Sequence, residues 1–235
     1  MTDTNLIKTI PGPQVDGRAT TTSIFPTSQL TQSPFLPNLL STINTAFRDS
    51  HALKPELGLT NHGERLSSTQ EFLSALISDP ESFVLIISYP HDSSTVLATA
   101  SCRRYHGPPK DRPVDANLPW LRTLDVAPDT EEWELKLMAT DVRVQGQGLA
   151  GYMMRTVEGE ILERFQRRIE MGRESSGGVA AAGLPGKVKM VICTPMELMG
   201  GFYLRRGYTL DYQNWRGEGY NFHIAFMHKM IWGDG

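Results

Sequence analysis

The amino-acid sequence predicts an α+β fold, in which a mixed β-sheet with mostly antiparallel pairs packs against helices. Segments rich in β-branched and aromatic residues alternate with segments whose apolar residues recur at helical spacing, in the order β-α-α-β-β-β-α-β-α-β-β. A single long helix joins the predicted strands 132–142 and 187–193, and such a crossover connects parallel neighbours. The remaining strands follow one another through short connections, which favours antiparallel pairing.

The N-terminal third is expected to supply a tail, one strand and two helices. Residues 1–18 contain prolines and glycines without any period and predict a flexible tail or a strap. Residues 19–25 are rich in β-branched types, which favours a strand. Ser67 or Ser68 is a good N-cap for the second helix. The remaining segments are a linker at 26–37, a first helix at 38–47, a loop at 48–66 and a second helix that ends near residue 77.

The middle of the chain predicts a hairpin, a long loop, a strand and a long helix. Strands at 83–89 and 96–105 flank a turn and form the hairpin. Residues 106–130 contain six prolines or glycines, and a loop of this length either covers a site or is a surface insertion. The strand 132–142 follows. The long helix then runs from about residue 148 to 170 with the apolar stripe Leu149, Met153, Val157, Ile161 and Phe165.

The last third is expected to contain an insertion, three strands and a short helix. Residues 171–186 are of low complexity and predict a mobile insertion. After a strand at 187–193, Thr194-Pro195-Met196-Glu197 has the pattern of a helix start, with Thr194 as the cap and Glu197 reaching back. Gly207 is expected to end this helix, and two strands follow at 208–212 and 222–231. We expect residues 19–235 to form a single domain.

Composition excludes several classes of protein. The 235 residues include 23 basic and 26 acidic side chains, and without a basic excess we expect no nucleic-acid partner. Only two cysteines occur, which excludes a disulfide framework and a cysteine zinc site and favours a reducing compartment. The apolar runs are too short to span a membrane. The first residues also lack the basic-then-apolar pattern of a secretory signal peptide. We therefore expect a cytoplasmic protein without a membrane partner, with diffusion into the nucleus left open.

The most informative motif lies between the strand 132–142 and the long helix. It reads Gln145-Gly146-Gln147-Gly148-Leu149-Ala150-Gly151. The N–H groups at the start of a helix have no partner within the helix, and together with the helix dipole they attract anions, most often phosphates. Glycines in such a loop allow a phosphate to approach the backbone closely. The sequence therefore predicts a pyrophosphate-binding loop at 145–151.

Two kinds of cofactor site use such a loop. Gly146-x-Gly148-x-x-Gly151 matches the dinucleotide fingerprint, but its context opposes that reading. The preceding strand alternates polar and apolar residues, whereas a central parallel strand is apolar throughout. The position about 20 residues further on, where a ribose-binding acid ends a second strand, falls in the low-complexity insertion. A nicotinamide or flavin enzyme is therefore the weaker alternative.

The other reading fits more of the chain. Gln145-x-x-Gly148-x-Ala150 resembles the Q/R-x-x-G-x-G/A pyrophosphate loop of the GCN5-related N-acetyltransferases, the GNAT family. The segment from Phe202 to Tyr208 and the final hairpin are also similar to that family. The likeness covers about residues 83–231 well and 19–77 only by element order. It implies a mixed, mostly antiparallel sheet of about six or seven strands with one splayed parallel pair, flanked by about four helices.

The resemblance implies acetyl transfer from acetyl-CoA, as co-substrate and without a metal, to the primary amine of a small molecule. In the family the pantetheine arm pairs with the strand before the loop, which here corresponds to Met138, Thr140 and Val142. A protein acetyltransferase that modifies lysine or N-terminal amines, and a non-catalytic acyl-CoA-binding module, remain alternatives. Whether the chain forms a homodimer is left open.

The resemblance also suggests a base and an acid. An alkylamine with a pKa near 10 is almost fully protonated at neutral pH, so it needs a base before it attacks the thioester. Glu134 is the candidate base, with Glu132 as a competitor on the same strand face, and Tyr203 is the candidate acid for the departing thiolate. The six histidines show no metal-binding spacing, and we read His223 and His228 as structural.

Overall fold

The computed structural model describes residues 7–59, 64–76, 79–92, 94–108, 121–175, 185–217 and 219–233. The chain divides into two compact units. The first unit consists of residues 1–103 and 135–157, and the second unit consists of residues 104–134 and 158–235. Residues 109–120 of the predicted loop 106–130 and residues 176–184 of the predicted insertion 171–186 lie outside the described residues.

The strands form one mixed sheet, as the sequence predicts, but it has eight strands rather than six or seven. Their order is β1-β2-β3-β4-β5-β6-β8-β7. The pair β5–β6 is parallel, as predicted, and the other pairs whose register is recorded are antiparallel. The bounds are β1 Lys8–Pro11, β2 Thr21–Pro26, β3 Phe83–Ser88, β4 Ala98–Tyr105, β5 Thr130–Thr140, β6 Lys187–Pro195, β7 Thr209–Trp215 and β8 His223–Trp232.

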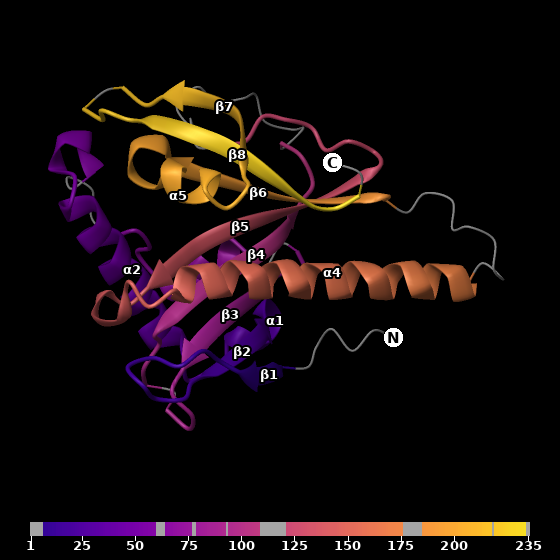
Figure 1. The fold of residues 1–235 in the computed structure, drawn as a ribbon, viewed down its shortest axis with the longest axis horizontal. Helices are drawn as coiled ribbons and strands as arrows, with labels where there is room; N and C mark the ends of the chain where they lie inside the picture. The colour runs from indigo at the N-terminus through magenta and orange to yellow at the C-terminus, as the bar shows by residue number, and fades with distance from the viewer. Residues whose placement is uncertain are drawn as a thin grey trace. The chain divides into compact units, whose positions relative to one another are not determined.

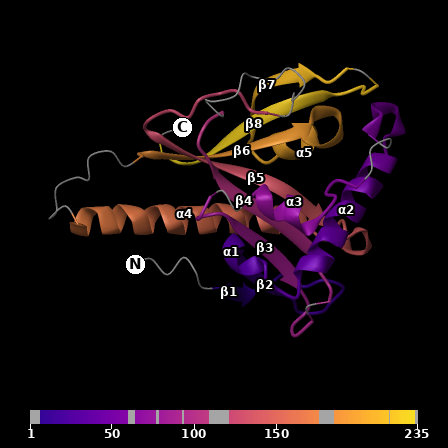
Figure 2. The same ribbon diagram turned by 180° about the vertical axis from the view of Figure 1, so that it is seen from behind.

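The first unit packs helices on both faces of its strands. Helices α1 (Thr27–Leu30), α2 (Leu36–Ala52) and α3 (Thr69–Ser74) cover one face (Figure 2), and the first turns of α4 (Leu149–Ser175) cover the other (Figure 1). The core beneath α2 and α3 is formed by apolar side chains of α1, α2, α3, β2, β3 and the end of β5, among them Leu39, Ile43, Phe72, Val84, Ile86 and Leu137. Burial of such side chains is the main stabilising contribution.

The second unit is built around β6, which pairs with β5 on one side and with β8 on the other. A π-helical turn, η4 (Met196–Gly200), follows β6 directly and continues into α5 (Gly201–Leu204). This segment lies against β6 and β8. Strand β7 completes the hairpin with β8, from Thr209↔His228 to Trp215↔His223.

Several boundaries differ from the sequence predictions. β1 lies within the predicted tail or strap, and α1 lies within the predicted linker 26–37. Helix α4 runs to Ser175, beyond its predicted end near 170. The predicted capped helix start at Thr194 is wrong, because Thr194 and Pro195 still belong to β6 and pair with β8.

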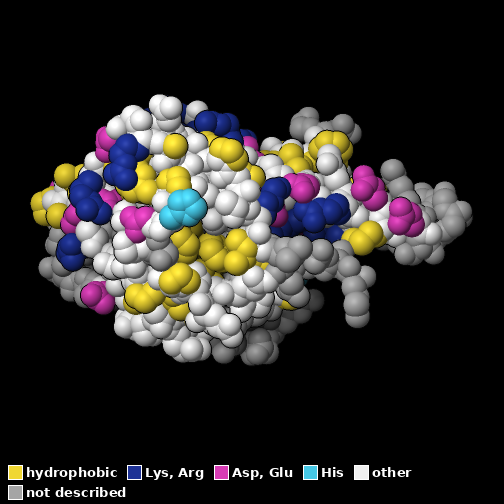
Figure 3. Space-filling model, turned by 90° about the horizontal axis from the view of Figure 1, so that it is seen from below, with side chains coloured by type: hydrophobic (Ala, Val, Ile, Leu, Met, Phe, Trp, Pro, Cys, Tyr) yellow, Lys and Arg dark blue, Asp and Glu magenta, His cyan; other side chains and the backbone are white. Residues whose placement is uncertain are grey.

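No helix in the described ranges is both long enough and apolar enough to cross a membrane. The surface charge is mixed, in keeping with the net charge of −3. On the face drawn in Figure 3, basic and acidic side chains lie next to one another.

The start of α3 gives a direct test of local structure. Ser68 accepts a hydrogen bond from the Glu71 N–H at 3.1 Å, while the Glu71 carboxylate accepts from the Ser67 N–H at 2.7 Å. Ser68→Ala should lower the free energy of unfolding by about 1 kcal/mol, because it leaves a helix N–H without its cap. Urea denaturation measures this change. Ser74→Ala, at the other end of the helix, is the control, and an equal loss there would contradict capping as the cause.

Candidate functional site

Strand β5 leads from the parallel pair with β6 to the predicted loop. Its register with β6 includes the pairs from Thr130↔Lys187 to Glu134↔Val191. Between residues 135 and 140 the side chains alternate as the sequence predicts, with Leu135, Leu137 and Ala139 buried. Leu137 has a φ of 49°, which is rare for a bulky residue and marks a departure from regular strand geometry.

A compact turn connects β5 to the predicted pyrophosphate loop. The Asp141 carboxylate accepts hydrogen bonds from the Arg143 N–H at 2.9 Å and from its guanidinium Nε at 3.0 Å. The hydrogen bond from the Arg143 side chain holds the pKa of the Asp141 carboxyl below its usual range. A 3₁₀ turn at Val142–Val144 (η3) follows, and the buried Val144 fixes it to the unit. The loop therefore begins from a well-anchored position.

The loop itself exposes its backbone. Gly146 and Gly148 have φ angles of 78° and 81°, in the left-handed region that favours glycine. A Cβ at either position would meet no atom within 4 Å, so the space beside this backbone is open. Helix α4 begins at Leu149, and its first recorded helical bond runs from the Tyr152 N–H to the Gly148 carbonyl. The N–H groups of residues 149–151 precede that bond and are suited to an anion.

The N-terminal segment contacts this loop. The Gln147 side-chain amide donates to the Asp16 carboxylate at 2.7 Å, and the Asp16 N–H donates to the Gln147 carbonyl oxygen at 2.9 Å. Tyr152, one turn into α4, lies within hydrogen-bond distance of the Thr22 hydroxyl at 3.1 Å. These contacts fix the exposed side of the loop without using the N–H groups of the first turn of α4.

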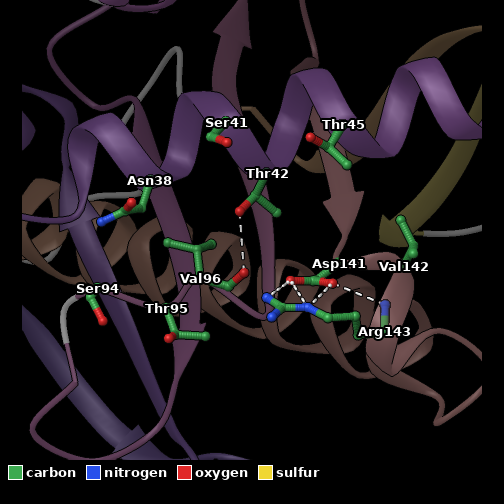
Figure 4. Close-up of a pocket in the computed structure, with 10 residues that line it drawn as sticks. All are labelled: Asn38, Ser41, Thr42, Thr45, Ser94, Thr95, Val96, Asp141, Val142 and Arg143. Carbon is green, nitrogen blue, oxygen red and sulfur yellow. Dashed lines mark hydrogen bonds and ion pairs between the residues drawn. The ribbon is translucent and has the colours of Figure 1, made fainter.

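A polar cavity of about 310 Å³ lies beside the turn that precedes the loop. Figure 4 shows that α2 forms one wall and that Asp141 and Arg143 form another. The Thr42 hydroxyl of α2 donates to the Val96 carbonyl at 3.2 Å and so spans the cavity floor. The lining is Asn38, Ser41, Thr42, Thr45, Ser94, Thr95, Val96, Asp141, Val142 and Arg143.

Tyr203, the candidate acid, belongs to the second unit and is only 8% exposed. Its ring contacts those of Phe202 and Tyr208 edge to face, with centroids 5.1 and 5.4 Å apart. Burial raises the pKa of its hydroxyl to about 12, and the positive charge of Arg206 offsets only part of this effect. Tyr203 is therefore a protonated hydrogen-bond donor at neutral pH.

The two candidate bases differ in environment. Glu132 is 1% exposed, and its carboxylate lies 2.5 Å from the Lys189 ammonium and 3.7 Å from the Arg122 guanidinium. Arg122 also contacts Asp211 at 2.7 Å. Glu134 lies opposite Val191 in the parallel pair and is partly exposed. Glu132 is thus committed to a buried ion-pair network, which favours Glu134 of the two.

Sequence reasoning missed one pair of residues in the second unit. Glu197, predicted to close a capping box, instead accepts hydrogen bonds from the backbone N–H of His223 at 2.8 Å and from its Nδ1 at 2.6 Å. The two residues are 26 positions apart, so no local pattern connects them. Their proximity follows from the pairing of β6 with β8, where Pro195 lies opposite Ile224.

The predicted site residues thus fall into two groups. Met138, Thr140, Val142 and the loop 145–151 belong to the first unit, and Glu134 and Tyr203 belong to the second. Within the described ranges, no group of three or more histidine, cysteine or acidic side chains is arranged to hold a metal ion.

Comparisons by sequence find no matching family model and no matching curated protein. By structure, the chain is similar to FeeM, an N-acyl amino acid synthase from uncultured soil microbes, at 12% identity and a TM-score of 0.48, over 96% of this chain and 92% of that one. It is also similar to a GNAT-family acetyltransferase from Staphylococcus aureus Mu50, at 9% identity and a TM-score of 0.46, over 96% of this chain and 99% of that one. An aminoglycoside 6'-N-acetyltransferase complexed with coenzyme A is similar at 13% identity and a TM-score of 0.41, over 82% of this chain and 92% of that one.

Glu132→Gln separates a structural role for Glu132 from a catalytic one. The change leaves Lys189 and Arg122 partly uncompensated, so the free energy of unfolding should fall by about 3–5 kcal/mol. Thermal and urea unfolding measure this loss. Glu163→Gln, which breaks an exposed ion pair with Arg167, should cost less than about 0.5 kcal/mol. A fully stable Glu132→Gln protein without activity would instead identify Glu132 as the base.

Proposed function

We propose that this protein is an acyltransferase that moves an acetyl group from acetyl-CoA to the primary amine of a small molecule. The observation that carries this proposal is the exposed loop 145–151, with two left-handed glycines and the start of α4 directly behind them. Main-chain N–H groups at such a position bind the pyrophosphate of a coenzyme. The motif Gln145-x-x-Gly148-x-Ala150 resembles the pyrophosphate loop of the GNAT family, which supports a coenzyme of the CoA class.

The end of β5 supports the same coenzyme. Residues 138–142 lead directly into the loop. A pantetheine arm has two amide groups, and we expect it to pair with this strand edge as an added strand would. Met138, Thr140 and Val142 would then supply main-chain contacts, and Gln145–Gly151 would hold the pyrophosphate.

In the chemistry that we propose, the amine loses a proton, attacks the thioester carbonyl and displaces the CoA thiolate. Glu134 is the proposed base and Tyr203 the proposed acid. A thiol has a pKa near 8.5, so full proton transfer from a phenol with a pKa of about 12 would be uphill by roughly 5 kcal/mol. Tyr203 therefore acts by donating a hydrogen bond to the sulfur as negative charge develops there.

The loop can be tested with one substitution. Gly148→Ala places a Cβ beside the proposed phosphate position and strains a φ of 81°, so the Kd for acetyl-CoA should rise at least about tenfold. Isothermal titration calorimetry measures this affinity. Gly159→Ala, inside α4 and in open space, is the matched control, and it should leave the affinity unchanged while raising stability by about 0.5–1 kcal/mol. Equal affinities in all three proteins would refute the loop assignment.

Tyr203→Phe tests the proposed acid. Removing the hydroxyl takes away one hydrogen bond to the departing sulfur, so kcat should fall by about 100-fold with little change in the KM for acetyl-CoA. Steady-state release of CoA thiol measures both constants. The ring contacts with Phe202 and Tyr208 do not need the hydroxyl, so the variant should fold. An unchanged kcat would remove Tyr203 from the chemistry.

A thiol-release screen tests the function as a whole. Acetyl-CoA is offered with amino acids, polyamines, aminoglycosides and lysine-containing peptides, and turnover with a small amine is the expected result. Turnover with peptides alone would favour a protein acetyltransferase. Tight CoA binding without turnover on any amine would favour an acyl-CoA-binding module.

A further inference from the structure

The pair Glu197–His223 has the geometry of an oriented acid–base group. One carboxylate oxygen of Glu197 accepts the backbone N–H of His223 at 2.8 Å, and the other lies 2.6 Å from the His223 Nδ1. Burial by itself would raise the pKa of the Glu197 carboxyl, but these hydrogen bonds from His223 outweigh it and hold the pKa below its usual value. Glu197 is therefore ionised at neutral pH and can only accept hydrogen bonds.

This arrangement determines which imidazole nitrogen is available. Because the carboxylate is an acceptor, Nδ1 is the donor of this hydrogen bond, and Nε2 is the ring nitrogen left to accept a proton. Among the described residues, none makes a hydrogen bond to Nε2. The side chain of His223 is 37% exposed, and the ring of Trp215, itself more than half exposed, packs against it with centroids 4.9 Å apart. Nε2 is thus an oriented proton acceptor that substrate can reach.

The pair lies at an edge of the sheet that is suited to chemistry. Pro195, the last residue of β6, pairs with Ile224, and His223 follows at the start of β8. Ligands of sheets with parallel strands bind beyond the carboxyl ends of those strands. Glu197 lies in the π-helical turn η4, a distortion that often marks functional sites, and α5 with Tyr203 continues from it. Glu134 pairs with Val191, four residues earlier on β6.

We propose that Nε2 of His223 accepts the proton of the acceptor amine in acyl transfer, with Glu197 as the positioning residue. This inference rests on the proposed function and adds His223 to Glu134 as a group that accepts a proton from the amine. The ammonium form of the acceptor gives one proton to Nε2, and the free amine forms a C–N bond to the thioester carbonyl. The C–S bond then breaks, the remaining extra proton of the attacking nitrogen passes to the departing thiolate, and the imidazolium, stabilised by Glu197, returns its proton to water.

A second histidine on the same strand serves as a matched control. His228 also faces a carboxylate, with its Nδ1 2.5 Å from Asp211. Asp211, however, already pairs with the buried Arg122 at 2.7 Å, and His228 is less exposed than His223. Both histidines thus lie on β8, and each faces a carboxylate of its own. Only His223 is next to the residue that pairs with the last residue of β6.

The experiment compares kcat/KM for the best amine of the screen among wild type, His223→Asn and His228→Asn. An asparagine amide can still donate to Glu197 but has no group at the Nε2 position. We expect His223→Asn to lose at least about 100-fold, and His228→Asn to lose less than about threefold. Added imidazole should restore activity to His223→Ala. Near-wild-type activity of His223→Asn, or an equal loss in His228→Asn, would overturn the proposal.

Two further readouts keep the inference separate from the proposed function. Acetyl-CoA affinity should be unchanged in His223→Asn, so lost CoA binding or lack of turnover in the wild-type protein refutes the function itself. The ¹⁵N shifts of the His223 ring report its tautomer without any substrate. A neutral ring protonated on Nδ1 supports the proposal, and one protonated on Nε2 contradicts it, even if every variant at this position fails to fold.

Discussion

The exposed glycine loop at the start of α4 is the feature on which the rest of the candidate site depends. Gly146 and Gly148 are in the left-handed region, and the N–H groups of the first turn of α4 lie directly behind them. Strand β5 leads into this loop, and β6 leads into the π-helical turn η4. The two segments that carry candidate chemistry therefore each follow a strand of the parallel pair.

Charges near this ladder have two different roles. Glu132, Lys189, Arg122 and Asp211 are largely buried and form a network of ion pairs, so their contribution is to fix β5, β6 and β7 to the segment around residue 122. Such groups are costly to leave unpaired and are poorly suited to exchange protons with a substrate. Glu197 and His223 are exposed enough to meet a ligand, and their geometry holds one imidazole nitrogen ready.

The sequence was sufficient for features that depend on local spacing. Alternation along β5 and the glycine spacing of the loop both follow from neighbouring residues, and the structure has both. Features that depend on distant partners could not be predicted in this way. Thr194-Pro195-Met196-Glu197 has every local mark of a capped helix, yet pairing with β8 keeps the first two residues in a strand. Glu197 instead forms hydrogen bonds with His223, which lies 26 residues away in the sequence.

In the proposed mechanism, Tyr203 and His223 have different tasks, and their environments differ accordingly. Aromatic neighbours bury the phenol and raise its pKa, so Tyr203 keeps its proton at neutral pH and can only donate a hydrogen bond to a developing thiolate. His223 is partly exposed, and the Glu197 carboxylate orients its ring through Nδ1. A buried phenol that keeps its proton and an oriented, partly exposed imidazole are suited to the acid and base roles of the proposed acyl transfer.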